Sequence, residues 1–187
     1  MVRSDEQLIT EYLDGSEQAL EVLVDRHLPH AYRFALGLTH DRQAAEDIAQ
    51  ESFIKAWKNI RGFRQGANFQ TWLFSIVRNT AIDFLRRKKE VSFSAFDTQG
   101  ANALVDTLAD QELLPDALLA KAEDASFAQS LLAELNPLYR NVLTLRYAND
   151  LTFKEIGAVL KRPVHTVKSQ HRRALIALRR SLEPRSA

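Results

Sequence analysis

The C-terminal part of the chain holds the pattern that most restricts how this polypeptide can fold. Thr152 and Glu155 stand at the spacing of a capping box, which marks the start of a helix whose side chains bond its first free N–H groups. A short apolar-periodic stretch follows and ends at Lys161-Arg162-Pro163, because proline cannot continue a helix. A second periodic stretch occupies 164–182, and Gly157 allows the two helices to approach closely. The sequence therefore predicts a helix-turn-helix.

Each of these two helices has an apolar face and a polar face. The apolar side chains recur at helical spacing, and they are Phe153, Ile156, Val159 and Leu160, then Val167, Ala174, Leu175 and Leu178. The opposite face of the second helix carries His165, Lys168, Ser169, Arg172 and Arg173. A recognition helix reads base edges in the major groove with its N-terminal residues and contacts phosphates with basic ones. We interpret this polar face as DNA-binding; the alternative is a basic hairpin packed on another protein.

The composition favours an all-α chain. Its 187 residues suffice for two small domains and include only 6 Gly and 5 Pro. The absence of cysteine excludes disulfide scaffolds, thiol catalysis and Cys-ligated zinc, and the histidines are dispersed. No apolar run approaches the roughly 18 residues of a membrane span, and residues 1–6 lack the apolar core of a signal peptide. We expect a cytoplasmic protein with no metal, cofactor or catalytic residue, in which His27 and His30 are surface residues of a helix.

Charge is segregated along the chain, although the net charge is only +1. The net charge is −5 over residues 1–60, +5 over 61–90, −7 over 91–137 and +8 over 138–187. Two basic blocks separated by acidic ones predict two contacts with a polyanion. The alternative, a random distribution of surface charge, rarely gives alternating blocks of this size.

Periodicity and capping residues predict the remaining elements. We expect helices at 4–13, 16–38, 41–60, 71–89, 115–135 and 136–147, in addition to the helix-turn-helix. Residues 91–110 carry turn-forming residues without periodicity, which is typical of a linker. The sequence thus predicts two small helical domains, 1–90 and 115–187, joined by a flexible acidic linker at 91–114.

The helix expected at 41–60 has a polar face with one apolar residue in it. That face carries Asp47, Gln50, Glu51 and Lys58, with Ile54 in their midst. A branched apolar side chain among groups able to make charge-assisted bonds is typical of a compact protein-binding hot spot. The alternative is a solvated face with one exposed isoleucine, which is common in proteins.

The basic block at 61–90 begins with a glycine-containing loop rich in aromatic and polar residues. Aromatic rings with arginine and asparagine suit unstacked bases, which stack on a ring while a polar side chain contacts an edge. The residues of this loop are Arg61, Phe63, Arg64, Asn68 and Phe69, and the following helix adds Asn79, Asp83 and Arg86 along one face. The alternative is that the aromatic residues belong to the core. We expect this for Trp72 and Phe74 and leave it open for Phe63 and Phe69.

Several of these stretches together resemble one protein family. Residues 47–57, 69–79 and 83–87 resemble region 2 of the extracytoplasmic-function (ECF) RNA polymerase sigma factors, group IV of the sigma-70 family. Residues 138–147, 151–156 and 166–169 resemble their region 4. The order and separation of the motifs and the total length match the minimal two-domain form of that family. The resemblance covers most of the chain outside the linker.

The resemblance implies a role for each face. The set Asp47, Gln50, Glu51, Ile54 and Lys58 would dock on the clamp helices of the largest subunit of core RNA polymerase. The loop and the helix after it would hold a flipped base and nearby DNA at the minus-ten promoter element. The polar face of the recognition helix would bind the minus-thirty-five element, and its domain would meet the flap of the second-largest subunit. The implied function is that of a sigma factor, in a stress or envelope response controlled by an anti-sigma protein.

The sequence departs from the family pattern at the helix-turn-helix. Family members usually carry glycine where Lys161 stands and a small residue where His165 stands, and often arginine at Gln170 and an apolar residue at His171. We expect Lys161 to adopt a left-handed conformation, which costs a non-glycine residue about 1 kcal/mol. The remaining alternatives are a stand-alone helix-turn-helix regulator, which leaves residues 47–57 unexplained, and a metal-dependent enzyme, which the dispersed histidines do not favour.

Overall fold

The computed structural model describes residues 3–64, 66–91 and 135–182, and every regular element in these ranges is helical. This confirms the predicted all-α fold. The first group of elements is α1 (Asp5–Leu13), α2 (Glu17–Thr39), α3 (Arg42–Asn59), the 3-10 turn η1 (Ile60–Gly62) and α4 (Phe69–Val91). The second group is α7 (Pro137–Leu143), the π turn η2 (Thr144–Ala148), α8 (Phe153–Leu160) and α9 (Val164–Leu182). The expected linker at 91–114 and the expected helix at 115–135 lie almost wholly outside the described residues.

Side chains at the helix ends explain most of the boundaries. The capping boxes of Ser4 with Gln7 and of Thr152 with Glu155 are both present. Asp41 caps α3, since its carboxylate accepts a hydrogen bond from the N–H of Ala44 at 3.2 Å. Helix α4 begins two residues before the predicted Thr71, because the side-chain oxygen of Asn68 accepts the N–H of Thr71 at 2.9 Å.

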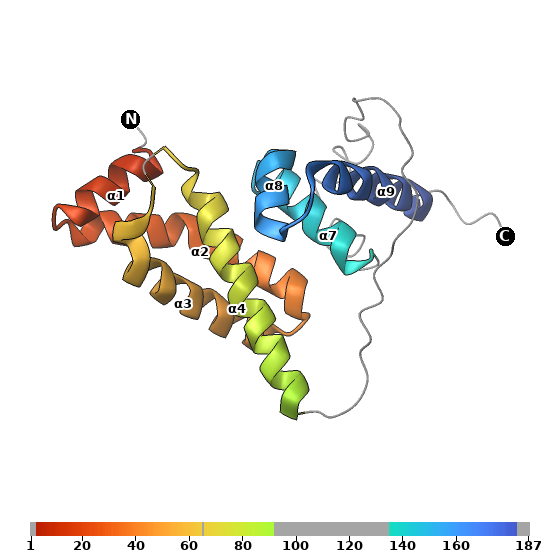
Figure 1. The fold of residues 1–187 in the computed structure, drawn as a ribbon, viewed down its shortest axis with the longest axis horizontal. Helices are drawn as coiled ribbons and strands as arrows, with labels where there is room; N and C mark the ends of the chain where they lie inside the picture. Colours follow the sequence, from red (N-terminus) through yellow and green to blue (C-terminus); the bar gives the residue numbers. More distant parts are fainter. Residues whose placement is uncertain (1–2, 65, 92–134, 183–187) are drawn as a thin grey trace.

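Helices α1 to α4 form a bundle around one apolar core. Helix α2 packs against α1, α3 and α4, and α3 also packs against α4 (Figure 1). The largest fully buried side chains of this bundle are Leu8, Leu23, Phe34, Ile48, Leu73, Phe74 and Val77. They occur at helical spacing on their elements, so the burial follows directly from the periodicity of the sequence.

The helix-turn-helix unit packs on this bundle. Helix α8 contacts α4, and α7 contacts α2 (Figure 1). The buried side chains of α8 join the core cluster of the bundle, while α7 and α9 share a second, smaller apolar cluster. A polar contact joins the units at His30, whose Nδ1 lies 2.8 Å from Oδ1 of Asn149. Within the described ranges, no helix is both long enough and apolar enough to cross a membrane.

Candidate functional site

Helix α3 presents the predicted docking face to solvent. Its buried residues, which include Ala45, Ile48 and Phe53, point into the bundle. The opposite side carries the residues predicted from the helical wheel: Asp47, Gln50, Glu51, Ile54 and Lys58. Ile54 is 54% exposed, the largest exposed fraction among the large apolar side chains of the described residues. The structure thus brings this set together around one solvent-exposed isoleucine.

Two of the acidic side chains on this face interact with neighbouring residues of α3. The Glu51 carboxylate pairs with the ammonium of Lys55 at 2.8 Å, one helical turn away. The amide of Gln43 donates a hydrogen bond to Asp47 at 3.3 Å. Both interactions are exposed, so they contribute little to stability and are available for exchange with a partner. The exposed face of α3 is suited to bind a surface that has an apolar pocket bordered by cationic and hydrogen-bonding groups.

The loop between α3 and α4 (the α3–α4 loop) is described at residues 61–64 and 66–68. Its cations Arg61 and Arg64 and its Asn68 are exposed, and Phe63 is half-buried. The amide oxygen of Asn68 already caps α4, so its role in the fold is established, whereas contact with DNA remains a prediction for it. The loop therefore offers two cations and one partly covered ring to a ligand.

The structure places Phe69 differently from its predicted DNA-contacting role. Phe69 is only 3% exposed. Its ring stacks on Trp57 with centroids 6.3 Å apart and lies 5.7 Å from Phe63 and 5.8 Å from Trp72. A base cannot stack on a ring whose faces are already covered by other rings. Phe69 is a core aromatic in this structure, and we remove it from the DNA-contacting set.

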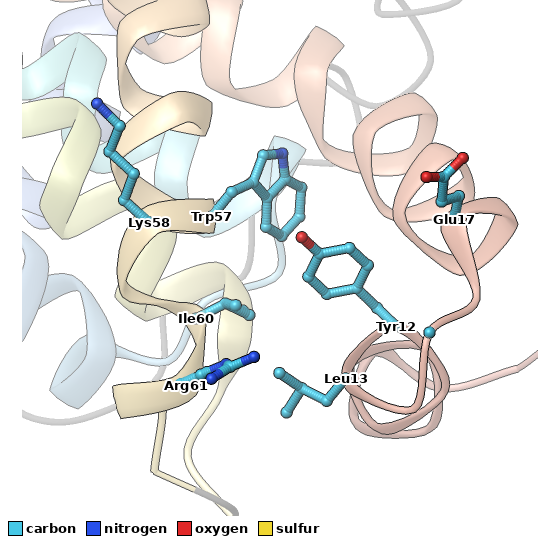
Figure 2. Close-up of a pocket in the computed structure, with 8 residues that line it drawn as sticks. Tyr12, Leu13, Glu17, Trp57, Lys58, Ile60 and Arg61 are labelled. Carbon is cyan, nitrogen blue, oxygen red and sulfur yellow. The ribbon is translucent and has the colours of Figure 1, made fainter.

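A cavity lies at the C-terminal end of α3, where Trp57 borders it. The cavity has a volume of about 370 Å³ and lies between α3 and the turn from α1 to α2. Figure 2 shows the rings of Tyr12 and Trp57 beside each other at its edge, with centroids 5.9 Å apart, and Lys58 and Arg61 on the side of α3 and η1. Two of the sequence-predicted residues thus border one concave surface next to the docking face.

Helix α4 carries the remaining predicted minus-ten residues on one side. Asn79 and Arg86 are exposed and Asp83 is half-buried, with Arg86 and Asp83 paired at 3.3 Å. Arg78 lies on the side that faces the helix-turn-helix unit. Burial, and then the nearby charge of Arg162, hold the pKa of Arg78 below its usual value.

Helix α9 presents its predicted DNA-reading residues to solvent. His165, Lys168, Ser169 and Arg173 are exposed and Arg172 is half-buried. Val167, Ala174 and Leu175 are buried on the other side of the helix. Because all five predicted residues lie on the N-terminal half of α9, they can enter a groove together.

Two residues that depart from the family pattern are accommodated by the structure. Lys161 has φ 53° and ψ 47°, the left-handed conformation expected from its position. His171 is 7% exposed and fills a position where an apolar residue is common in the family. Its Nε2 lies 2.9 Å from the hydroxyl of Tyr147, and its ring meets Phe153 edge-on. Burial raises the pKa of that tyrosine, against the smaller opposing effect of the Arg146 charge.

The expectation that His27 is a surface residue was wrong. His27 is 5% exposed, and its Nε2 lies 2.9 Å from the carboxylate of Asp5. The sequence offered no local signal for this pair, because Asp5 belongs to another helix. No group of residues with metal-binding potential occurs in the described ranges.

Two family models match this chain, one in each group of helices. The family described as Sigma-70 region 2 matches residues 23–91, and Sigma-70, region 4, matches residues 131–180. The ECF RNA polymerase sigma factor SigW of Bacillus subtilis is 33% identical over 170 residues, which cover 90% of this chain and 91% of that protein.

Two solved structures have the same fold. The structure of CnrH in complex with the cytosolic domain of CnrY has a TM-score of 0.63 and 25% identity, covering 97% of this chain and 99% of that one. The sigma factor RpoE in complex with the anti-sigma factor NepR, from Bartonella quintana, has a TM-score of 0.63 and 22% identity, covering 89% and 98%. The stand-alone regulator is not favoured by these findings. The chain belongs to the extracytoplasmic-function RNA polymerase sigma factors of the sigma-70 family.

Proposed function

We propose that this sigma factor binds core RNA polymerase through α3, brings it to promoters with two sequence elements and initiates DNA melting. The observation that carries the proposal is the pair of exposed functional faces, one on α3 and one on α9, in a chain matched by both regions of the family. The chain acts by binding alone, and core polymerase performs the chemistry. We place its action in the cytoplasm, where core polymerase and DNA are.

The polymerase contact is assigned to the face centred on Ile54. An exposed isoleucine ringed by charged and amide groups has the layout of a hot spot, in which an apolar anchor is surrounded by polar contacts that exclude water. The proposed partner surface is the clamp-helix pair of the largest polymerase subunit. Region 4 would contact the flap of the second-largest subunit.

The DNA contacts are assigned to two basic surfaces. The minus-ten surface comprises the α3–α4 loop and the exposed side of α4, and its residues are Arg61, Phe63, Arg64, Asn68, Asn79, Asp83 and Arg86. The minus-thirty-five surface is the exposed face of α9. The minus-ten surface would bind unstacked bases. Because an intact duplex does not offer such bases, their binding would drive DNA melting.

We also propose that a partner protein controls this sigma factor. CnrH, at 25% identity, was solved with the cytosolic domain of CnrY bound to it. RpoE of Bartonella quintana was solved with the anti-sigma factor NepR. An anti-sigma protein would keep this chain inactive until an envelope or stress signal releases it. Affinity purification of the endogenous protein from uninduced cells checks this, and recovery with core polymerase as its sole stoichiometric partner would contradict it.

The main experiment is transcription by a reconstituted holoenzyme. Purified protein is mixed with core polymerase lacking any sigma, and run-off transcripts are mapped on a library of genomic fragments from the source organism. We expect defined starts preceded by a shared two-part motif. Failure to bind core polymerase would reject the proposed function.

The docking face is tested separately with a matched pair of variants. Asp47→Ala combined with Ile54→Ala removes a carboxylate and the exposed isoleucine from α3, and we expect core affinity to fall by about tenfold or more. The control is Asp25→Ala combined with Ile82→Ala, which removes the same groups from exposed positions on α2 and α4. Equal affinities of the two double variants would reject the assignment.

A further inference from the structure

The described residues at the tip of the α3–α4 loop are Arg64, Gly66 and Ala67, and two backbone N–H groups among them donate hydrogen bonds. The N–H of Ala67 donates to the carbonyl of Arg64 at 3.1 Å, which closes a β-turn. Gly66 has φ +80°, a left-handed value that glycine adopts readily because it has no Cβ. The N–H of Gly66 is not used by this bond, and it donates to an acceptor outside the loop.

That acceptor is Glu6, from the first turn of α1. The N–H of Gly66 donates to Oε1 of Glu6 at 2.7 Å, across 60 residues of sequence. Hydrogen bonds to an ionised acceptor are shorter and stronger than neutral ones. Among the described residues, this is the one hydrogen bond that joins positions 64–67 to a helix other than the two that flank the loop.

The first turn of α1 is itself held in place, so the Glu6 carboxylate is offered from a fixed position. Asp5 pairs with Arg26 at 2.5 Å and with His27 at 2.9 Å, and Arg26 also donates to the carbonyl of Arg3 at 2.9 Å. Burial alone would raise the pKa of Asp5, but the bonds and charges of His27 and Arg26 outweigh it and lower that pKa. Asp5 therefore remains ionised near neutral pH and keeps α1 attached to α2.

A contact from α2, supported by Asp5 of α1, holds the other end of the loop. His27, held by Asp5, meets the ring of Phe69 edge-on with centroids 5.3 Å apart. Phe69 is the first residue of α4 and follows the loop directly. Adjacent residues of α1, Asp5 and Glu6, thus support the end and the tip of the loop.

We propose that Glu6 is a positioning residue for promoter opening: its bond to Gly66 holds the α3–α4 loop so that Arg64 and Asn68 meet single-stranded DNA in one preset arrangement. This inference rests on the proposed function of the loop. Helix α1 precedes residue 23, where the region 2 match begins, so the support comes from outside the matched segment. A loop that is ordered before binding loses less conformational entropy when DNA binds.

The contact is tested in the free, full-length chain by amide hydrogen exchange. In Glu6→Ala we expect faster exchange at the Gly66 N–H, by about fivefold, because the bond to an exposed charged acceptor is lost. Glu6→Gln keeps a side-chain oxygen and should restore part of the protection. Glu21→Ala removes an equally exposed carboxylate from α2 and should leave Gly66 unchanged. Unchanged exchange in Glu6→Ala would overturn the inference.

The role is tested in the holoenzyme on a promoter recovered by the transcription experiment, with promoter opening followed by fluorescence of 2-aminopurine in the minus-ten element. For Glu6→Ala we expect opening to be about fivefold weaker, with partial rescue in Glu6→Gln and wild-type behaviour in Glu21→Ala. Affinity for core polymerase should stay unchanged in all three variants, which excludes a general loss of structure. Opening that is unchanged or stronger in Glu6→Ala would refute the positioning role. An inactive wild-type holoenzyme would instead reject the proposed function, with the exchange result still standing.

Discussion

Replacing Lys161 by glycine should stabilise this protein, and the size of the effect follows from the turn of the helix-turn-helix. The N–H of Arg162 donates to the carbonyl of Gly157 at 2.9 Å, and that of Lys161 points to the carbonyl of Ala158 at 3.4 Å. These are the two bonds of a Schellman motif, which ends a helix with a residue in the left-handed conformation. Lys161 occupies that residue's place with φ 53° and ψ 47°.

Two opposing terms set the magnitude. The left-handed conformation costs an L-residue with a Cβ about 1–2 kcal/mol, and glycine removes this cost. Glycine in turn makes the unfolded chain more flexible, which takes back about 0.5–1 kcal/mol. The net expectation for Lys161→Gly is a gain of about 0.5–1 kcal/mol, or a rise in Tm of roughly 1–4 °C for a chain of this size.

The assay is urea denaturation followed by circular dichroism at the helix band, with Lys161→Ala as the control. The alanine variant loses the same charge and the same aliphatic chain but keeps the left-handed strain, so the difference between the two variants isolates the backbone term. We expect Lys161→Gly to be more stable than both Lys161→Ala and the wild type. A glycine variant no more stable than the alanine variant would refute the strain argument.

Three other substitutions test particular parts of the fold and of the DNA surface. Gly157→Ala would place a methyl 2.8 Å from the backbone oxygen of Arg162, so we expect a loss of about 2 kcal/mol in urea denaturation, and increased stability would contradict the close approach. Phe69→Ala should cost about 3–5 kcal/mol in the same assay if Phe69 is a core aromatic, and a cost below about 1 kcal/mol would return it to the candidate DNA contacts. Arg172→Ala should weaken promoter binding by the holoenzyme and reduce the slope of log K against log salt by about 1, whereas an unaltered slope would exclude a phosphate contact.

Local patterns in the sequence predicted the elements and the exposed faces well. Both capping boxes, the end of α8 at Lys161 and the exposure of Ile54 follow from residues within one or two helical turns of each other. Such signals depend on short-range hydrogen bonds and on helical periodicity, which a single sequence displays. Helix α4 begins earlier than the sequence predicts, because Asn68 in the preceding loop acts as its cap.

Contacts between distant residues could not be predicted in this way. His27 looked like a surface residue because its partner, Asp5, lies on another helix and its burial depends on Phe69. Phe69 itself follows a glycine-containing loop, a context in which core and binding roles give the same sequence pattern. The bond from Glu6 to Gly66 spans 60 residues and joins two exposed positions, neither of which is distinctive on its own.

Helix α8 forms much of the contact between the two helical units, and a partner that binds between them must break this contact. Helix α8 is buried at Ile156, Val159 and Leu160, because it lies between α9 on one side and α4 on another. Separation of the units would expose apolar side chains of α8 to water. This costs about 25 cal/mol for each Å² of apolar surface exposed, unless the partner that separates the units covers that surface. The same contact brings the like charges of Arg78 and Arg162 near each other, and their repulsion opposes the apolar attraction. The net attraction between the units is therefore smaller than their buried apolar surface alone would give.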